Sequence, residues 1–194
     1  MNYPNSINKE YHKVISHANR GMDLEAIINE TNEYLREKDI ALIYKKPTPI
    51  GISDVEYKNN HAVIKKGYFA YQSTLDYNGL YKGKYLEFEA KNTESKTSFP
   101  LNNIHEHQIK HIRKVIKHNG IVFLIVRINN EIYVLMGKDF IDYIDNHKRK
   151  SIPYSYFQEV GYLLKYYYGK GLNYLQIIDN FIRSDMDEKN QNKI

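Results

Sequence analysis

The most informative part of the chain is the alternating run Tyr85-Leu86-Glu87-Phe88-Glu89-Ala90-Lys91. Because successive side chains of a β-strand point to opposite faces, the run predicts a strand with one apolar face and one face that carries Glu87, Glu89 and Lys91. Amphipathic strands are common, and their charged face often does no more than contact water. The neighbouring sequence must therefore decide between a solvated face and a site.

The segment before this run is Thr74-Leu75-Asp76-Tyr77-Asn78-Gly79. A hairpin that turns at Lys82-Gly83 pairs the two segments and brings Asp76 close to Glu89. Two carboxylates that pack together repel each other unless a cation lies between them, and oxygen ligands in a chain without cysteine favour Mg²⁺ or Mn²⁺. Lys91 is placed to hold an attacking water or to offset charge on a phosphate. An acid followed by acid-x-lysine on the next strand is typical of metal-dependent phosphodiesterases with the restriction-endonuclease fold.

The composition excludes several classes of protein. The chain has 194 residues, 42% hydrophobic and 26% charged, so we expect one ordered domain. It has no cysteine, which excludes a disulfide framework, thiolate metal sites and thiol catalysis. No apolar run approaches the ~20 residues of a membrane helix and no signal-peptide stretch is present, so we expect a soluble cytoplasmic protein without a membrane partner. The net charge of +5 permits binding to nucleic acid without establishing it.

The hydrophobic periodicity predicts an α/β or α+β sandwich with a mixed sheet flanked by helices. We expect helices near 21–38, 103–118, 138–146 and 172–183, a buried strand at 40–44, a strand at 50–57, a hairpin of 74–81 with 84–91, a central strand at 121–128 and a further strand at 131–136. Residues 58–73 read as an excursion from the body because they have few core-forming aliphatic side chains. The tail, residues 185–194, is expected to be frayed.

Beyond these patterns, several short motifs of the chain resemble those of one family, in its order and spacing from about residue 19 to residue 128. They are Asn19-Arg20-Gly21-Met22 with Leu24-Glu25, Lys45-Lys46-Pro47-Thr48-Pro49, Ala62-Val63-Ile64-Lys65 with Tyr68-Phe69, Ser73-Thr74 with Asp76-Tyr77-Asn78-Gly79, Phe88-Glu89-Ala90-Lys91, Lys96-Thr97-Ser98-Phe99-Pro100-Leu101 and His107-Gln108-Ile109. The family is that of the RecU-type Holliday junction resolvases. Two departures are a short segment before Asn19 and an acidic strand at residues 53–57.

The resemblance implies a homodimeric, Mg²⁺-dependent endonuclease, with Mn²⁺ as an alternative metal, that nicks four-way DNA junctions symmetrically in recombination and repair. It implies a single nuclease domain of residues 1–194 with the restriction-endonuclease-like fold. It assigns the metal to Thr74, Asp76, Glu89 and Gln108, and catalysis to Asp76, Glu89 and Lys91. A recombinase and a branch-migration helicase are the expected protein partners.

The resemblance also implies an arm, or stalk, at residues 55–73 that enters the junction. We expect its lysines to contact phosphates and its aromatic rings to stack on unpaired bases, with Arg20 as a further phosphate contact or a helix-capping neighbour. The expected DNA-binding residues are Arg20, Lys58, Lys65, Lys66, Tyr68, Phe69 and Tyr71.

Several assignments stay open at this point. Glu25 is equally suited to support the site from behind and to pair with a lysine in solvent, and Glu87 is interpreted as a neighbour of the site. The histidines at 105, 107 and 111 are assigned to solvent, DNA backbone or packing in preference to zinc. The alternatives to a resolvase are a restriction-type or repair nuclease that acts on duplex DNA and a non-catalytic junction-binding modulator of recombination.

Overall fold

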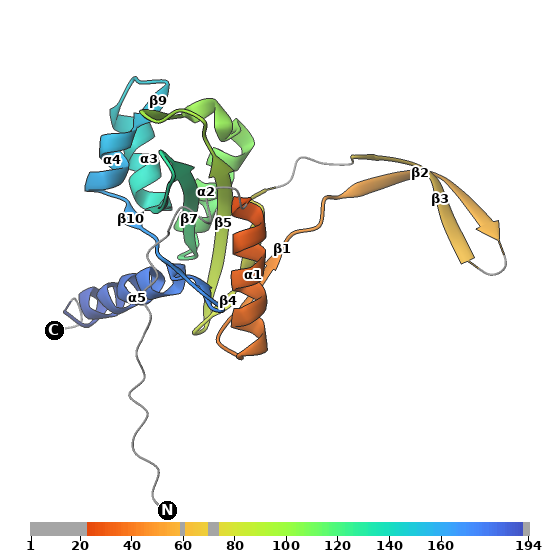
Figure 1. Cartoon of the computed structure of the whole chain (residues 1–194), viewed down its shortest axis with the longest axis horizontal. Helices are drawn as coiled ribbons and strands as arrows, with labels where there is room; N and C mark the ends of the chain where they lie inside the picture. The colour runs from red at the N-terminus through yellow and green to blue at the C-terminus, as the bar shows by residue number, and fades with distance from the viewer. Residues whose placement is uncertain (1–22, 59–60, 70–73, 192–194) are drawn as a thin grey trace, which may run out of the picture.

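A mixed β-sheet forms the centre of the protein, whose computed structural model describes residues 23–58, 61–69 and 74–191. Within these residues the main sheet has six strands in the order β1-β4-β5-β7-β8-β10. The strands are β1 (Leu42–Lys45), β4 (Tyr77–Tyr81), β5 (Lys84–Asn92), β7 (Ile121–Ile128), β8 (Glu131–Met136) and β10 (Tyr162–Leu163). Strands β5 and β7 are parallel, and the other neighbours in the sheet are antiparallel (Figure 1).

Helices cover both faces of this sheet. On one face, α1 (Leu24–Glu37) and α5 (Tyr174–Gln191) pack their apolar side chains against Phe88 and Phe123. On the other face, α2 (Glu106–Lys117), α3 (Gly137–Asn146) and α4 (Tyr154–Glu159) enclose a second core around Leu124 and Phe157. The result is a three-layer α/β arrangement, as the predicted mixed sheet with flanking helices requires.

The predicted hairpin turn at Lys82-Gly83 is confirmed by its backbone angles, and the turn between β7 and β8 has the same form. Lys82 and Gly83 have φ of 47° and 72°, and Asn129 and Asn130 have φ of 49° and 63°. Positive φ at both central residues is the signature of a tight two-residue hairpin turn, which Asn and Gly adopt at low cost. The first turn sets the register of β4 on β5, in which Tyr77 lies opposite Phe88.

The central strand was also predicted correctly, because β7 is buried along nearly its whole length and lies between β5 and β8. Parallel strands need a crossover, and the chain makes it through β6 (Ser98–Pro100), the short 3₁₀ helix Leu101–Asn103 and α2. Helix α2 ends before Asn119 (φ 59°) and Gly120, residues that commonly end helices. This crossover lays α2 across the face of β5 that carries Glu87 and Glu89, since Gln108 and His111 of α2 contact residues there.

Three expectations need correction or extension. The segment at residues 40–44 is not a buried strand, because among the described residues β1 is an edge strand that pairs with β4 alone, and Leu42 and Tyr44 are 48% and 53% exposed. A five-residue apolar run does not reveal which faces of a strand are covered. Helix α5 extends through residue 191, so part of the tail that was expected to be frayed is helical, and residues 192–194 lie outside the described residues. The short strands β9 (Ser151–Pro153), β10, β11 (Tyr166–Tyr167) and β12 (Gly171–Leu172) were not predicted, because two or three residues carry no periodicity. The six-residue helix α4 was not predicted either.

A separate two-stranded ribbon extends from the body. Strands β2 (Ile50–Lys58) and β3 (His61–Phe69) pair only with each other, every residue of β3 is exposed, and Figure 1 shows the ribbon reaching away from the sheet. It begins at Ile50, earlier than the expected arm boundary at residue 55. A Cβ on Gly51 would lie 2.5 Å from the ring of Tyr68, so the missing side chain makes room for that ring across the ribbon.

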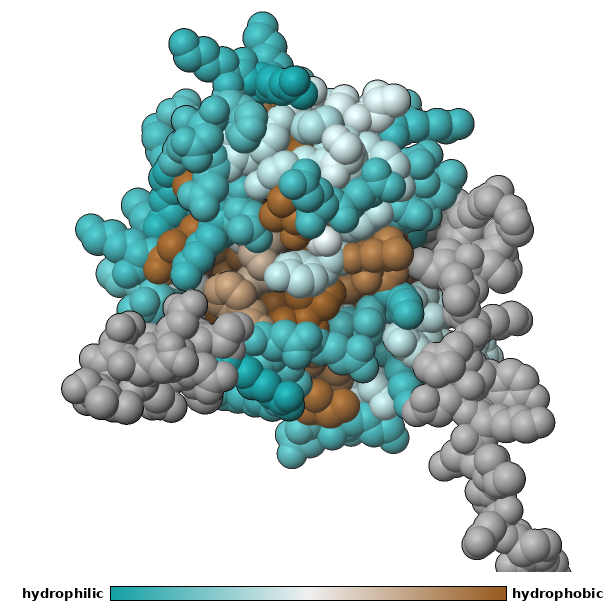
Figure 2. Space-filling model, turned by 90° about the vertical axis from the view of Figure 1, so that its left-hand side faces the viewer, coloured by the Kyte–Doolittle hydropathy of each residue, from teal (hydrophilic) through white to brown (hydrophobic). Residues whose placement is uncertain are grey.

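The side of the body opposite the ribbon is mostly hydrophilic, with apolar side chains gathered in a band across its middle (Figure 2). Strand β10 ends the sheet there, and Tyr162 and Leu163 are about half exposed, at 47% and 49%. Among the described residues, no helix combines the length and the apolar character needed to cross a membrane.

Candidate active site

Asp76 and Glu89 lie together where β4 begins, as the hairpin predicted. Asp76 directly precedes β4, and its backbone N–H donates to Glu89 Oε2 over 2.9 Å. Glu89 is 0% exposed because β5 is an inner strand of the sheet with helices on both sides. The carboxylate of Glu89 is therefore held in place by backbone, while Asp76 remains partly exposed beside it.

The charge of Glu89 is incompletely compensated. Its Oε1 has no hydrogen-bond partner, and although Lys91 Nζ lies 2.6 Å away, this ion pair is not aligned as a hydrogen bond. Burial raises the pKa of Glu89 above its ordinary value; Lys91 opposes the shift, and the nearby charge of Asp76 adds to it. A buried carboxylate oxygen that lacks a hydrogen bond is a position where a metal cation would add stability.

Thr74 and Gln108 complete the group that the sequence placed here. The Gln108 side-chain nitrogen donates to the carbonyl oxygen of Thr74 over 3.1 Å, and its Oε1 accepts the backbone N–H of His105 over 3.0 Å. Gln108 is 5% exposed, so its location at the first turn of α2 turns it inward rather than into solvent. Lys91 lies beside the group with 30% of its side chain exposed, within reach of a substrate.

These residues fit a hard divalent cation. The available donors are carboxylate, hydroxyl, amide and carbonyl oxygens, which Mg²⁺ and Mn²⁺ prefer, and one of them, the buried Oε1 of Glu89, forms no hydrogen bond. In the described part of the chain, no three His, Asp or Glu side chains gather in a way that would hold a metal ion. A metal here would consequently need the oxygens of Thr74 and Gln108, or water, in addition to the two carboxylates.

A second buried carboxylate, Glu87, has a role that the sequence did not reveal. It is 0% exposed, and one oxygen pairs with Lys46 Nζ while the other accepts from Tyr85 OH over 2.9 Å and contacts His111 Nε2 at 2.8 Å. Burial alone would raise the pKa of Glu87, but Lys46 and His111 outweigh it and lower the pKa below its ordinary value. The same carboxylate helps to raise the pKa of Tyr85 to about 12.

Two sequence signals could have revealed this cluster. Strand alternation places Glu87 on the face of Glu89, and the spacing of three residues from Gln108 to His111 puts both on one side of α2. Neither strand alternation nor helix spacing applies to Lys46, because it follows the last residue of β1. Its position follows from the backbone: its N–H donates to the carbonyl of Asp76 over 2.8 Å and so extends the pairing of β1 with β4 by one residue.

Other expected site residues lie elsewhere. Glu25 forms an ion pair with Lys45, with both side chains nearly half exposed, which corresponds to its interpretation as a partner of a lysine. Arg20 and Tyr71 lie outside the described residues.

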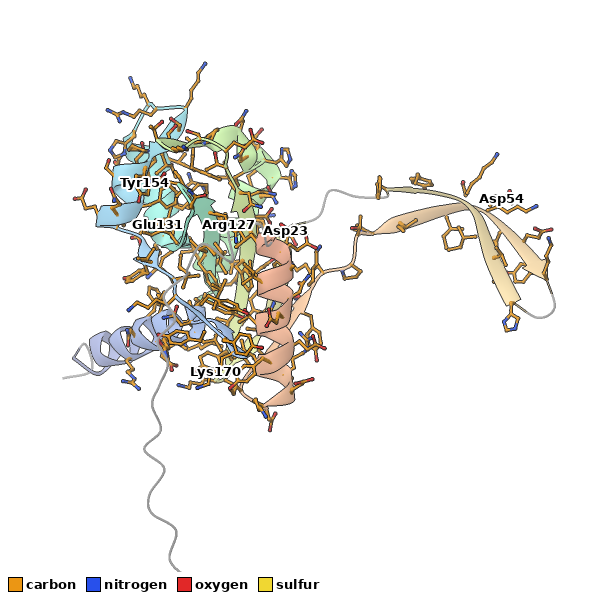
Figure 3. The ribbon with its side chains drawn as sticks, in the orientation of Figure 1. Asp23, Asp54, Arg127, Glu131, Tyr154 and Lys170 are labelled. Atoms are coloured by element: carbon orange, nitrogen blue, oxygen red, sulfur yellow. The ribbon has the colours of Figure 1, made fainter. Side chains whose placement is uncertain are left out.

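The remaining expected DNA contacts are on the ribbon. Glu56 pairs with Lys58 at 3.5 Å and with Lys65 at 3.0 Å, so part of their charge is already compensated. Lys66 lies opposite Asp54 in the ribbon, and Figure 3 shows Asp54 far from the helices of the body. Of the aromatic residues, Phe69 is 80% exposed and Tyr68 is 59% exposed.

Comparison with known proteins identifies the family. The family model described as "Recombination protein U" (RecU) matches residues 19–180. A protein of Bacillus pumilus named "Holliday junction resolvase RecU" is 45% identical over 177 residues, which is 89% of this chain and 86% of the relative. Its namesakes from Geobacillus sp. (46% over 170 residues; 84% of this chain, 85% of the relative) and Oceanobacillus iheyensis (45% over 194 residues; 92% and 98%) are similarly close. The sequence motifs, the mixed sheet and this extended similarity lead to one conclusion: the chain belongs to the RecU family.

Proposed function

We propose that the protein is a Holliday junction resolvase, an endonuclease that introduces paired, symmetric nicks into four-way DNA junctions during recombination and repair. Its membership of the RecU family and the names of its relatives support this role. One structural observation carries the chemistry: Glu89 on β5 accepts the backbone N–H of Asp76, just before β4, and its buried Oε1 is paired with Lys91 without a hydrogen bond.

In this proposal Thr74, Asp76, Glu89 and Gln108 hold a divalent cation, Mg²⁺ or Mn²⁺. When bound, such an ion lowers the pKa of water and stabilises negative charge on the scissile phosphate. Asp76 and Glu89 supply its charged ligands. Lys91, partly exposed and anchored by Glu89, orients the attacking water or neutralises charge that develops on the phosphate. The sheet between two layers of helices, with Asp76 before β4 and Glu89 and Lys91 on β5, supports a single nuclease domain with the restriction-endonuclease-like fold.

We assign junction selectivity to the ribbon of β2 and β3. An exposed ribbon that leaves the body can enter the open centre of a four-way junction, where unstacked bases lie beside converging backbones. Phe69 and Tyr68 expose ring faces on which such bases can stack, and the lysines at 58, 65 and 66 can contact phosphates. Glu56 weakens the contribution of Lys58 and Lys65, and Lys66 lies opposite Asp54, so acidic residues of the ribbon limit its positive charge.

Two symmetric nicks require two sites related by a two-fold axis, so we propose a homodimer as the working unit. We place its work in the cytoplasm, together with a recombinase that forms such junctions and a helicase that moves them.

The experiment that tests the function compares a mobile synthetic four-way junction with a linear duplex of the same sequence, both end-labelled, in Mg²⁺. We expect paired nicks at symmetric positions in the junction, little cutting of the duplex, and no cutting by Glu89→Gln. Equal cutting of both substrates would favour a duplex nuclease instead. Junction binding without any metal-dependent nicking would favour a non-catalytic modulator and refute the proposal.

A further inference from the structure

The two buried carboxylates of β5 have opposite surroundings. Glu89 leaves one oxygen without a hydrogen-bond donor, whereas both oxygens of Glu87 are occupied, one by Lys46 and the other by Tyr85 and His111. A carboxylate whose acceptor positions are filled has little capacity left for a metal. Glu87 is therefore suited to hold the ammonium group of Lys46. The role of this pair depends on the other contacts that Lys46 makes.

Lys46 is attached to the segment that carries two of the proposed metal ligands. Its Nζ donates to Thr74 Oγ1 over 2.6 Å, and its backbone N–H donates to the carbonyl of Asp76 over 2.8 Å. The side chain of Lys46 is largely buried, with 20% of it exposed. Thr74 and Asp76 precede β4, so no strand pairing fixes Thr74, and its side chain depends on contacts from other parts of the chain.

We propose that Glu87 and Lys46 are a positioning pair that holds Thr74 for the metal site. Glu87 fixes the ammonium group of Lys46, which in turn fixes the rotamer of Thr74 by its hydroxyl while Gln108 holds the Thr74 carbonyl. With Thr74 Oγ1 accepting from Lys46, its second lone pair is the one left to face a cation. This inference rests on the proposed function, because it requires a metal at Thr74, Asp76 and Glu89.

The test measures Mn²⁺ binding to the full chain without DNA, by isothermal titration calorimetry. Loss of a residue that orients a metal ligand commonly weakens metal binding by about 10–100-fold. We expect Glu87→Gln and Lys46→Met each to weaken Mn²⁺ binding at least tenfold, and the double variant to weaken it no more than the stronger single variant, since the two residues act as one unit. Junction affinity in EDTA should stay within about threefold of wild type for Glu87→Gln.

Glu131→Gln is the matched control. Glu131 lies on β8, two strands away from β5. Like Glu87 it accepts hydrogen bonds from tyrosine, here from Tyr133 and Tyr154, and Figure 3 shows Glu131 and Tyr154 on the body. It should lose thermal stability but bind Mn²⁺ as wild type does. If Glu87→Gln does not fold, Mn²⁺ binding by Lys46→Met tests the positioning pair. Lys46→Arg, which keeps the positive charge, should restore Mn²⁺ binding.

Folded variants that bind Mn²⁺ within twofold of wild type would overturn the positioning pair even if they were less stable. Wild type that binds no more Mn²⁺ than Glu89→Gln does would instead refute the proposed metal site itself. The two failures are therefore distinguishable.

Discussion

Replacing Glu89 by Gln should make the metal-free protein more stable while it abolishes nicking. A buried polar group without a hydrogen bond costs about 1–3 kcal/mol, and more when it is charged; Glu89 is 0% exposed, and its Oε1 is paired with Lys91 without hydrogen-bond geometry. The amide oxygen of Gln can still accept the N–H of Asp76. The lost ion pair with Lys91 offsets up to about 1 kcal/mol, because that ammonium is 30% exposed and can turn to water. A net gain of about 1 kcal/mol remains, which is about 2–4 °C in Tm for a chain of this size.

The stability that Glu89→Gln gains in the absence of metal should depend on pH. The pKa of Glu89 in the folded protein is raised above its ordinary value of 4.5. At a pH between the ordinary pKa and the raised pKa, the folded state holds a proton that the unfolded state has released. Wild-type stability therefore falls as pH rises through this window, and the variant lacks that loss. The advantage of Glu89→Gln in EDTA should be smallest near pH 4.5 and should grow towards pH 8.

Differential scanning fluorimetry in EDTA and in Mg²⁺ measures both effects. A ligand at about 100 times its Kd stabilises the folded state by about 2.7 kcal/mol, which exceeds the gain from the substitution. We therefore expect Glu89→Gln to melt higher than wild type in EDTA and lower in saturating Mg²⁺. If Glu89→Gln melts well below wild type in EDTA at pH 8 and responds to Mg²⁺ as wild type does, then the Glu89 charge neither destabilises the metal-free protein nor binds the metal.

Three further outcomes are expected. Lys91→Ala should reduce single-turnover nicking by at least 100-fold while junction affinity in EDTA stays within about threefold; near wild-type nicking would remove Lys91 from the mechanism. Gly79→Ala should lower stability by about 1–3 kcal/mol in urea unfolding, because a Cβ there would lie 2.0 Å from the carbonyl oxygen of Leu42, and an unchanged midpoint would show that β1 yields easily. Replacing residues 58–71 by a short Gly/Ser turn should weaken junction binding much more than duplex binding at equal salt, whereas equal losses would make the ribbon a general DNA clamp.

The features that sequence predicted well are those set by local periodicity and turn chemistry. The alternation around Glu89, the hairpin at Lys82-Gly83 and the apolar run of β7 each have one simple structural solution, and together they place Asp76 beside Glu89. Gln108 needed the family resemblance, because an amide on a helix has no pattern of its own.

The parts that sequence missed depend on tertiary contacts. Burial of β1 could not be judged because exposure depends on whether another strand pairs with it. The contacts of Glu87 with Lys46 and His111 join three segments far apart in the chain, and no periodicity relates them. The pairing of Glu56 with Lys65 depends on the register of β2 on β3, which shifts near Asp54.

The central claim is that Thr74, Asp76, Glu89 and Gln108 form the metal site of the nuclease. Anomalous diffraction from crystals soaked in Mn²⁺ tests it most directly. The account predicts a strong anomalous peak between the carboxylates of Asp76 and Glu89 in wild type, and its loss in Glu89→Gln. A peak bound instead at Glu87 and His111, or no peak at Mn²⁺ concentrations that support nicking, would contradict it.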